Sequence, residues 1–194
     1  MKEMLSHKKS LDILRKTNAL LEGHFVLSSG LHSSKYIQCA KLLSYPSKAT
    51  EICKSLALKI KKKFKKIDLI LAPAMGGIII GYEIGRILNK ETIFCERVKG
   101  KFTLRRGFEI KKGSKVLIIE DVITTGKSSM ECVKLIKKSK AKLVGFASII
   151  DRSTQKSLKI KSKIISHLKI NVPVYKKSQI PFELKSVPIT TPGS

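Results

Sequence analysis

Blocks of apolar and mixed positions along this chain predict an α/β order of elements. Short continuous apolar runs are typical of strands buried on both faces, and they occur at 68–72, 92–96, 116–119 and 143–150. Amphipathic helical patterns fall between them, over 46–66, from the glycines near 76 to 88, and over 128–140. Strands that alternate with helices in this way favour a parallel sheet.

The two ends of the chain have different patterns. Residues 3–21 predict an amphipathic helix that Gly23 stops, and 24–39 predict two short strands around a Ser-Ser-Gly turn. Pro46 suits the first turn of the next helix, with Ser44 as its candidate N-cap. Residues 164–170 predict an edge strand, and we expect the tail after them, rich in proline and lysine, to be mostly irregular.

The stretch 115–129, KVLIIEDVITTGKSS, holds the strongest chemical signal. Its apolar run ends in two carboxylates, Glu120 and Asp121, and a small-residue turn at 124–126 leads into a helix start at Lys127 or Ser128. Backbone N–H groups in such a turn bind anions. Because carboxylates accept hydrogen bonds from a vicinal diol, the stretch suits a ribose 5-phosphate.

Two other interpretations apply to this stretch. The letters GKS also end the nucleotide-triphosphate P-loop, but that motif needs a glycine five residues before Gly126, where Asp121 stands. A carboxylate there would repel the phosphates, so we reject the P-loop. The plainer alternative, two solvated acids after a strand and an ordinary helix cap, stays open for this stretch taken alone.

The stretch resembles the diphosphoribosyl-binding signature of type I phosphoribosyltransferases, an apolar run, two acids and a T-T-G-x-S-type loop. Residues 23–36 resemble the N-terminal hairpin of orotate phosphoribosyltransferases, G-x-F-x-L-x-S-G-x-x-S-x-x-Y. The resemblance implies an α/β fold, a parallel sheet flanked by helices, with a small hood from the N-terminal hairpin and C-terminal strands. It implies a single domain over 1–194, with the hood about 1–45 and 160–194 and the core about 46–159.

In that family the signature binds 5-phosphoribosyl 1-diphosphate, and a flexible basic loop closes over the diphosphate from the neighbouring subunit of a dimer. A run of cations at 97–106 matches this loop, although a solvated surface is the plainer alternative. By resemblance, the catalytic residues are Arg97, Lys101 and Asp121. By resemblance also, the diphosphoribosyl-binding residues are Arg97, Lys101, Glu120, Asp121, Val122, Ile123, Thr124, Thr125, Gly126, Lys127 and Ser128.

The resemblance also implies an orotate site at Tyr36, Ile37, Thr124 and Arg152. Backbone groups of the hairpin would face the pyrimidine, and Arg152 would hold the carboxylate of orotate through a bidentate pair. The alternative from the residues alone is that Arg152 pairs with Asp151 or another nearby acid.

The chain departs from its relatives where some of them carry a lysine, at Ser28, Gly76 and Val98. The role of the first lysine is lost, or another cation such as Lys35 supplies it. At Gly76, in the segment 73–77 that matches the diphosphate loop, binding would depend on backbone N–H groups.

Cysteine usage and apolar runs indicate the compartment. Cys39, Cys53, Cys95 and Cys132 form no C-x-x-C pair, so neither a zinc site nor a disulfide framework is indicated. No apolar run approaches the roughly 20 residues of a membrane span, and the N-terminus lacks the apolar stretch of a secretory signal. We expect a cytoplasmic protein with reduced thiols and no membrane partner.

The net charge of +26 over 194 residues favours anionic partners. Because the lysines are spread through the chain and aromatic residues suited to base stacking are few, we do not expect specific nucleic-acid binding. The resemblance implies that a homodimer joins orotate to 5-phosphoribosyl 1-diphosphate, with Mg²⁺ bound mainly through substrate oxygens and no metal site in the protein. The alternatives are a purine phosphoribosyltransferase and a non-enzymatic regulator of the same fold that binds nucleic acid.

Overall fold

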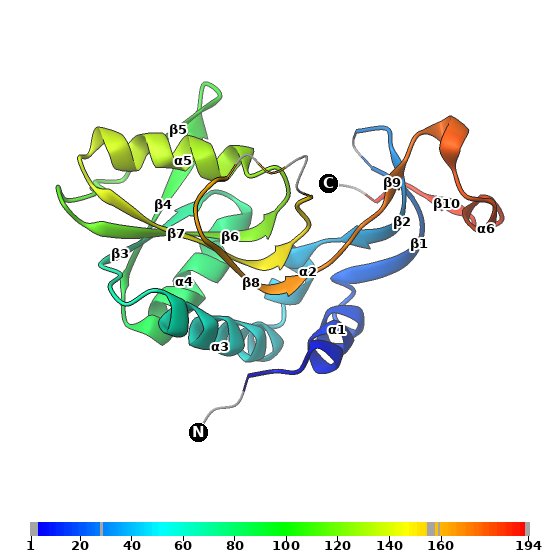
Figure 1. Cartoon of the computed structure of the whole chain (residues 1–194), viewed down its shortest axis with the longest axis horizontal. Coiled ribbons are helices and arrows are strands. Elements are labelled where there is room, and N and C mark those ends of the chain that lie inside the picture. The colour runs from blue at the N-terminus through cyan, green and yellow to red at the C-terminus, as the bar shows by residue number, and fades with distance from the viewer. Residues whose placement is uncertain (1–3, 28, 155–157, 159, 193–194) are drawn as a thin grey trace.

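A six-stranded sheet runs through the larger half of the molecule (Figure 1). The computed structural model describes residues 4–27, 29–154, 158 and 160–192. The strand order is β5-β4-β3-β6-β7-β8, and all neighbours are parallel except β4 and β5. The strands span Leu69–Pro73 (β3), Glu91–Val98 (β4), Lys101–Thr103 (β5), Lys115–Ile123 (β6), Lys142–Asp151 (β7) and Ile164–Lys169 (β8). The parallel sheet expected from the sequence is confirmed, with β8 at its edge.

Helices cover both faces of this sheet because its central strands are apolar on both sides. On one face, α3 (Pro46–Lys63) and α4 (Gly76–Leu88) share a buried cluster with Leu117 and Ile119 of β6. On the other face, α5 (Lys127–Lys138) packs in a second cluster with Val116 and Ile118. Alternate residues of β6 therefore point to opposite helical layers, which decides the surroundings of every side chain along it.

A second, four-stranded sheet forms the hood at the other end of the molecule (Figure 1). Its order is β10-β1-β2-β9, and β1 and β2 form the predicted antiparallel hairpin. The remaining elements are α1 (His7–Lys16), β1 (Leu20–Val26), β2 (His32–Ile37), α2 (Cys39–Leu43), β9 (Val174–Tyr175), the 3₁₀ helix η1 (Lys177–Gln179), α6 (Phe182–Lys185) and β10 (Ile189–Thr190). Ser28, where some relatives carry a lysine, lies outside the described residues.

The N-terminal helix is shorter than the sequence pattern predicted. α1 ends at Lys16 because the Thr17 hydroxyl donates to the backbone oxygen of Ile13 at 2.9 Å and Asn18 is left-handed, with a φ of 54°. The apolar positions after it belong to β1, where Leu21 pairs with Tyr36 of β2. A strand partner in the hood therefore overrides the helical spacing of these residues.

Two further boundaries were wrong at the sequence level. Ser44 is not the N-cap of α3; it ends the short helix α2, and its hydroxyl donates to the backbone oxygen of Lys41 at 2.8 Å. The hood was expected to resume at residue 160, but β8 lies in the large sheet because it pairs with β7. The C-terminal part of the hood therefore begins after Lys169.

The basic segment expected as a loop begins as a tight β-hairpin. β4 continues to Val98, and β5 starts at Lys101. The two turn residues, Lys99 and Gly100, both have left-handed backbones, with φ of 48° and 79°. Such a pair is typical of two-residue hairpin turns, whose twist matches that of the strands.

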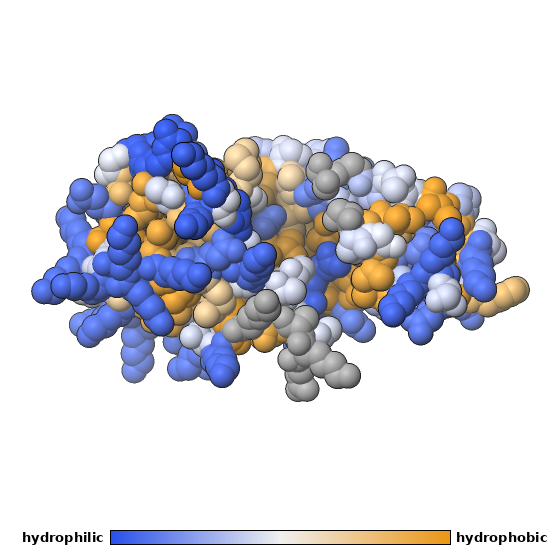
Figure 2. Space-filling view, turned by 90° about the horizontal axis from the view of Figure 1, so that it is seen from above, coloured by the Kyte–Doolittle hydropathy of each residue, from blue (hydrophilic) through white to orange (hydrophobic). Residues whose placement is uncertain are grey.

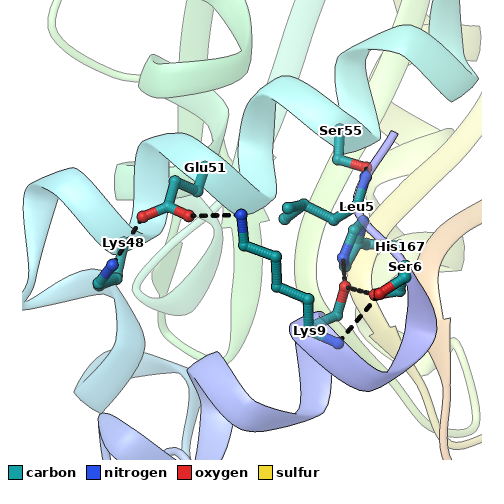
Figure 3. A network of polar contacts seen from close by, with 8 residues as sticks. Leu5, Ser6, Lys9, Lys48, Glu51, Ser55 and His167 are labelled. Atoms are coloured by element: carbon teal, nitrogen blue, oxygen red, sulfur yellow. Dashed lines mark hydrogen bonds and ion pairs between the residues drawn. The ribbon is translucent and has the colours of Figure 1, made fainter. Parts of the chain in front are cut away.

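A polar network anchors α1 to the core (Figure 3). Its contacts run from Lys9 to Glu51 of α3 at 3.9 Å, from the Leu5 amide to the Ser55 hydroxyl at 3.0 Å, and between His167 Nε2 of β8 and the Ser10 hydroxyl at 2.8 Å. The network joins the N-terminal segment to a helix and an edge strand that are far away in sequence. Because Ser10 and His167 are both buried, this last contact is shielded from water.

Hydrophilic side chains extend from the core half of the surface on the α5 side, with hydrophobic surface between them and on the hood (Figure 2). Among the described residues, no helix combines the length and the apolar character that crossing a membrane requires.

We predict that His167 makes the free energy of unfolding depend on pH. Burial lowers its pKa from 6.5 to about 4, so the unfolded chain takes up a proton in this range that the folded chain does not. Stability is therefore full above about pH 6.5 and falls as the pH falls towards 4, by at most about 3 kcal/mol. Urea unfolding of the wild type and His167→Gln at several pH values measures the difference.

The comparison with the variant is necessary because Glu120 acts in the opposite direction. Burial raises the pKa of Glu120 to about 7, which favours the folded state as the pH falls through the same range. Subtracting the His167→Gln curve removes this contribution. Equal pH dependence of the two proteins would contradict the assignment to His167.

Candidate functional site

A cavity of about 290 Å³ opens at the C-terminal ends of β3 and β6. In a parallel sheet with helices on both faces, this edge is where ligands bind. The cavity is lined by Pro73, Ala74, Gly76, Phe102 and every residue from 120 to 129. It therefore takes in the whole of the predicted phosphate and ribose stretch, from Glu120 to Ser128.

The turn after β6 presents the N-terminus of α5 to this cavity, and the Lys127 amide there donates to the Thr125 hydroxyl at 3.3 Å. Gly126 is the N-cap of α5, with a left-handed φ of 72°, and it makes no side-chain capping bond. A Cβ at this position would lie 2.6 Å from the side chain of Ile160, which packs over the turn. The first-turn N–H groups of α5 and the positive end of its dipole are thus directed towards an anion.

A second helix N-terminus flanks the cavity from the other face of the sheet. α4 starts at Gly76, directly after β3, and its N-cap, Met75, also makes no side-chain capping bond. A Cβ on Gly76 would lie 2.6 Å from a carboxylate oxygen of Asp121. Without movement of Asp121, no side chain fits at position 76, which gives a physical reason for the absence of the lysine that some relatives carry there.

The two acids of the signature lie within β6, not after it as the sequence pattern indicated, and their side chains point to opposite faces. Glu120 faces α5 and accepts a hydrogen bond from the Ser129 hydroxyl at 2.8 Å. Asp121 faces α4, against Gly76, and accepts one from the Val122 amide at 2.8 Å. The ribose site therefore has one carboxyl group on each side of the strand.

Burial changes the acidity of both carboxyl groups. It raises the pKa of Glu120 to about 7, with a smaller contribution from the charge of Asp121 and an opposing one from the Ser129 hydrogen bond. Burial also raises the pKa of Asp121, against the amide of Val122. Hydroxyl groups that donate to these carboxylates would favour their charged forms, so a bound diol compensates for the lost water.

Arg152 comes from the end of β7 and meets the hood. Burial lowers the pKa of its guanidinium, and the charged forms of Cys39 and Tyr36 act against this shift, so both groups lie within electrostatic range of Arg152. Its Nε is buried and has no hydrogen-bond partner within the described part of the chain, and no ion pair there includes Arg152. The alternative pairing with Asp151 is wrong, because no ion pair joins these two described residues; the Asp151 carboxylate instead accepts from the Ser153 amide at 2.7 Å.

Of the other predicted orotate residues, Thr124 lines the cavity, and Tyr36 and Ile37 lie at the end of β2 in the hood. Tyr36 is half-buried against Phe25, with ring centroids 5.8 Å apart, and Ile37 belongs to the main core cluster. Directly after them, Cys39 is buried, and its thiol lies 3.8 Å from the backbone oxygen of Asp121. The strand therefore enters the core beside the catalytic candidate Asp121.

Arg97 and Lys101 are not brought to this cavity. Arg97 pairs with Glu131 of α5 at 2.8 Å, donates to the Gly100 backbone oxygen at 2.8 Å, and lies 4.2 Å above the ring of Phe102. Lys101 is exposed at the start of β5. Phe102, which follows Lys101 and pairs with Arg97 across the hairpin, is the described residue of this hairpin that lines the cavity.

Sequence reasoning missed three residues of the site. Ser129 was overlooked although it lies one residue beyond the signature. Phe102 was overlooked because the basic residues around it were the only signal considered in that segment. Cys39 carried no signal, because its proximity to Asp121 arises only when the hood packs on the core.

The parallel sheet, the two helix N-termini and the acids between them are typical of α/β domains that bind phosphoribosyl groups. Residues 45–179 match the family model of the phosphoribosyl transferase domain. Two curated relatives called orotate phosphoribosyltransferase, from Erythrobacter litoralis and Parvibaculum lavamentivorans, are 42% and 44% identical to this chain over 191 residues, covering 98% of each chain.

Solved structures agree on the fold. The orotate phosphoribosyltransferase from Aeropyrum pernix has a TM-score of 0.68 at 22% identity, covering 82% of this chain and 92% of that one. The orotate phosphoribosyltransferase from Mycobacterium tuberculosis has a TM-score of 0.66 at 18% identity, covering 83% and 94%. The chain belongs to the phosphoribosyltransferase family and, within it, to the orotate phosphoribosyltransferases.

We predict that Gly126→Ala weakens the binding of ribose 5-phosphate by at least about tenfold. The left-handed backbone costs a non-glycine residue about 1 kcal/mol, and the contact with Ile160 adds to this. Calorimetric titration of the variant and of Gly126→Ala/Ile160→Ala separates the two causes, since the second substitution relieves only the contact. Gly113→Ala, whose Cβ would meet nothing within 4 Å, controls for backbone strain elsewhere. Unchanged affinity in Gly126→Ala would remove this turn from the phosphate site.

Proposed function

We propose that this chain transfers the phosphoribosyl group of 5-phosphoribosyl 1-diphosphate to orotate, giving orotidine 5′-monophosphate and diphosphate, a step of de novo UMP synthesis. Arg152 is the observation that carries the proposal. It is a half-buried cation whose buried Nε–H has no hydrogen-bond partner among the described residues. Tyr36 of the hood lies within electrostatic range of it, and the backbone amide of Arg152 donates to the backbone oxygen of Ile123 in the cavity wall at 2.8 Å. A base that bears a carboxylate supplies the partner that Arg152 lacks, whereas adenine, hypoxanthine and uracil have none. The name shared by the curated relatives supports the same substrate.

In the proposed reaction, a ring nitrogen of orotate forms a bond to C1 of the ribose as the bond from C1 to the diphosphate oxygen breaks. Positive charge develops on the ribose, and no protein nucleophile is required. The N–H groups from Thr124 to Ser128 hold the 5-phosphate. Glu120 and Asp121 accept hydrogen bonds from the ribose hydroxyls, and Asp121 stabilises the developing charge.

The remaining roles follow the shape of the cavity. The N–H groups at the start of α4 meet the diphosphate, with Gly76 permitting its close approach. Arg152 holds the orotate carboxylate, the backbone of Tyr36 and Ile37 faces the ring, and Thr124 completes the orotate site. We also propose that residues 1–194 form a single domain.

We also propose Mg²⁺ as the cofactor, held mainly by diphosphate and ribose oxygens. Among the described residues, no group of three His, Cys, Asp or Glu side chains could hold a metal ion, which fits an ion that arrives with its substrate. Bound there, Mg²⁺ would neutralise charge on the leaving diphosphate. The four cysteines are free and buried, which fits a reducing compartment, and we propose the cytoplasm.

A homodimer would bring to the cavity the two cations, Arg97 and Lys101, that the chain's own fold does not place there. Met75, Ile79 and Tyr82 form an apolar stripe on one face of α4 and are 83%, 55% and 67% exposed. Such a stripe is typical of an interaction surface, and a second copy could cover it. Because α4 starts at the cavity, the partner would lie close enough for its Arg97 and Lys101 to reach the diphosphate.

The first test of this function is the loss of orotate absorbance with 5-phosphoribosyl 1-diphosphate and Mg²⁺, with adenine, hypoxanthine and uracil as alternative bases. We expect turnover of orotate alone. Arg152→Ala should raise the KM for orotate at least about tenfold, the cost of one charge-assisted hydrogen bond, with little change in the KM for 5-phosphoribosyl 1-diphosphate. Arg15→Ala, which removes an exposed cation of α1, is the matched control. An unchanged KM in Arg152→Ala would exclude this residue from the site.

Subunit mixing tests the shared hairpin. Lys101→Ala and Asp121→Ala should each be nearly inactive as homodimers. After random mixing of equal amounts, half of the dimers are mixed, and each has one cavity with both groups intact, so up to about a quarter of the wild-type rate should return. No recovery in mixed dimers verified by mass would show that Lys101 acts within its own subunit or not at all.

A further inference from the structure

A basic groove lies between α3 and α4, on the face of the sheet opposite α5. It consists of two adjoining hollows, each of about 340 Å³, that share Lys61 as a common wall. The first hollow is lined by Lys54, Ala57, Leu58, Lys61, Arg86 and Ile87. The second is lined by Lys61, Phe64, Lys65, Lys66, Ile67, Asp68, Leu88 and Lys90. We call this pair of hollows the α3–α4 groove.

Cations dominate the walls of the groove. Six of the lining residues are basic, and the single acid, Asp68, already accepts a hydrogen bond from the Lys115 amide at 2.8 Å. Arg86 pairs with Glu83 at 2.8 Å. None of the five lysines forms an ion pair with another residue in the described ranges. No ion pair between described residues therefore offsets the mutual repulsion of these lysines.

Helix ends explain only part of this charge. α3 ends at Lys63 and α4 at Leu88, and each carboxyl end contributes about −0.5 charge, which favours nearby cations. Six cations and one carboxylate leave five positive charges, and the two helix ends reduce this to about four. Counting Glu83 as well leaves about three. The groove is thus positive beyond what the helix ends require.

The floor of the groove is apolar. Leu58 and Ile87 are half-buried in the first hollow, and Phe64 and Ile67 are buried beneath the second. A flat ring can pack on the floor of the first hollow while linked phosphates meet the lysines of the second. Concave shape, apolar floor and cationic walls together distinguish the groove from a solvated lysine surface.

We propose that the α3–α4 groove is a second ligand site, which binds a nucleoside triphosphate with its base in the first hollow and its phosphates at Lys61, Lys65, Lys66 and Lys90. The site is separate from the reaction cavity. α4 starts at that cavity with Gly76 and reaches the groove at Arg86, a helical distance of roughly 15 Å. The proposal does not depend on which base the enzyme uses.

Calorimetric titration of the full-length protein with UTP and ATP at physiological ionic strength, without orotate, tests the proposal. We expect saturable binding by at least one of them, at least about tenfold tighter than that of inorganic tripolyphosphate. Lys61→Glu/Lys65→Glu should weaken this binding at least about tenfold. Lys134→Glu/Lys137→Glu, which makes the same charge change on exposed residues of α5, should change it less than about twofold.

Other variants separate the outcomes. Leu58→Ser should weaken the nucleotide but not tripolyphosphate, because it removes only apolar floor. Nucleotide binding that is lost in Gly126→Ala but kept in Lys61→Glu/Lys65→Glu would place the ligand in the reaction cavity and overturn the proposal. Equal affinity for tripolyphosphate, or tighter binding of oligouridylate RNA than of either nucleotide, would also overturn it. Orotate turnover of the Lys61→Glu/Lys65→Glu protein is assayed separately. The binding test and the test of the proposed reaction can therefore fail independently of each other.

Discussion

The register of β6 between β3 and β7 is the constraint on which the reaction cavity depends. Val116 lies opposite Leu69 of β3, and Glu120 lies opposite Ser148 of β7. Because side chains alternate along a strand, a shift of one residue would exchange the faces of Glu120 and Asp121. It would also move apolar residues such as Ile118 out of their helical layer. The packing of the core thus fixes which carboxyl group faces α5 and which faces α4.

Close approaches at two glycines complete this arrangement. Gly76 leaves room for the Asp121 carboxylate, and Gly126 leaves room for Ile160 while adopting a left-handed backbone. In both cases a side chain on the glycine would collide with its neighbour, so glycine lets the start of the helix lie close to the cavity. Backbone N–H groups at two helix starts therefore contribute to the positive character of this cavity, beside the side chain of Lys127.

The hood adds what the core sheet cannot supply. β2 brings Tyr36 within electrostatic range of Arg152, which directly follows β7, and α2, the helix after β2, places the Cys39 thiol 3.8 Å from the backbone oxygen of Asp121. The polar network of α1 with α3 and β8 ties the same N-terminal segment to the core (Figure 3). Packing of the hood on the core thus leaves Arg152 half-buried, with a buried Nε–H that no described residue accepts. A buried charge is stabilised by an anionic partner, so this environment favours a negatively charged ligand.

Local patterns in the sequence determined the parallel sheet, its helices, the hairpin of the hood and the stretch from Glu120 to Ser128, because apolar periodicity and turn chemistry act over a few residues. Where these patterns gave the wrong boundary of an element, tertiary contacts set the boundary instead. Leu20 and Leu21 leave the helical pattern because β2 pairs with them, and β6 extends through both acids because β7 continues beside it as far as Asp151.

Distances across the fold could not be read from the sequence. Arg152 was a candidate for the orotate carboxylate from the start, but only the structure shows that no acid among the described residues pairs with it and that hood residues lie within its electrostatic range. Arg97 matched the family motif, yet in the folded chain it pairs with Glu131, outside its own cavity. The sequence by itself predicted candidate residues for the chemistry, since residue types and local spacing are visible in it. Tertiary structure decided which of them meet, since burial and pairing depend on packing between distant segments.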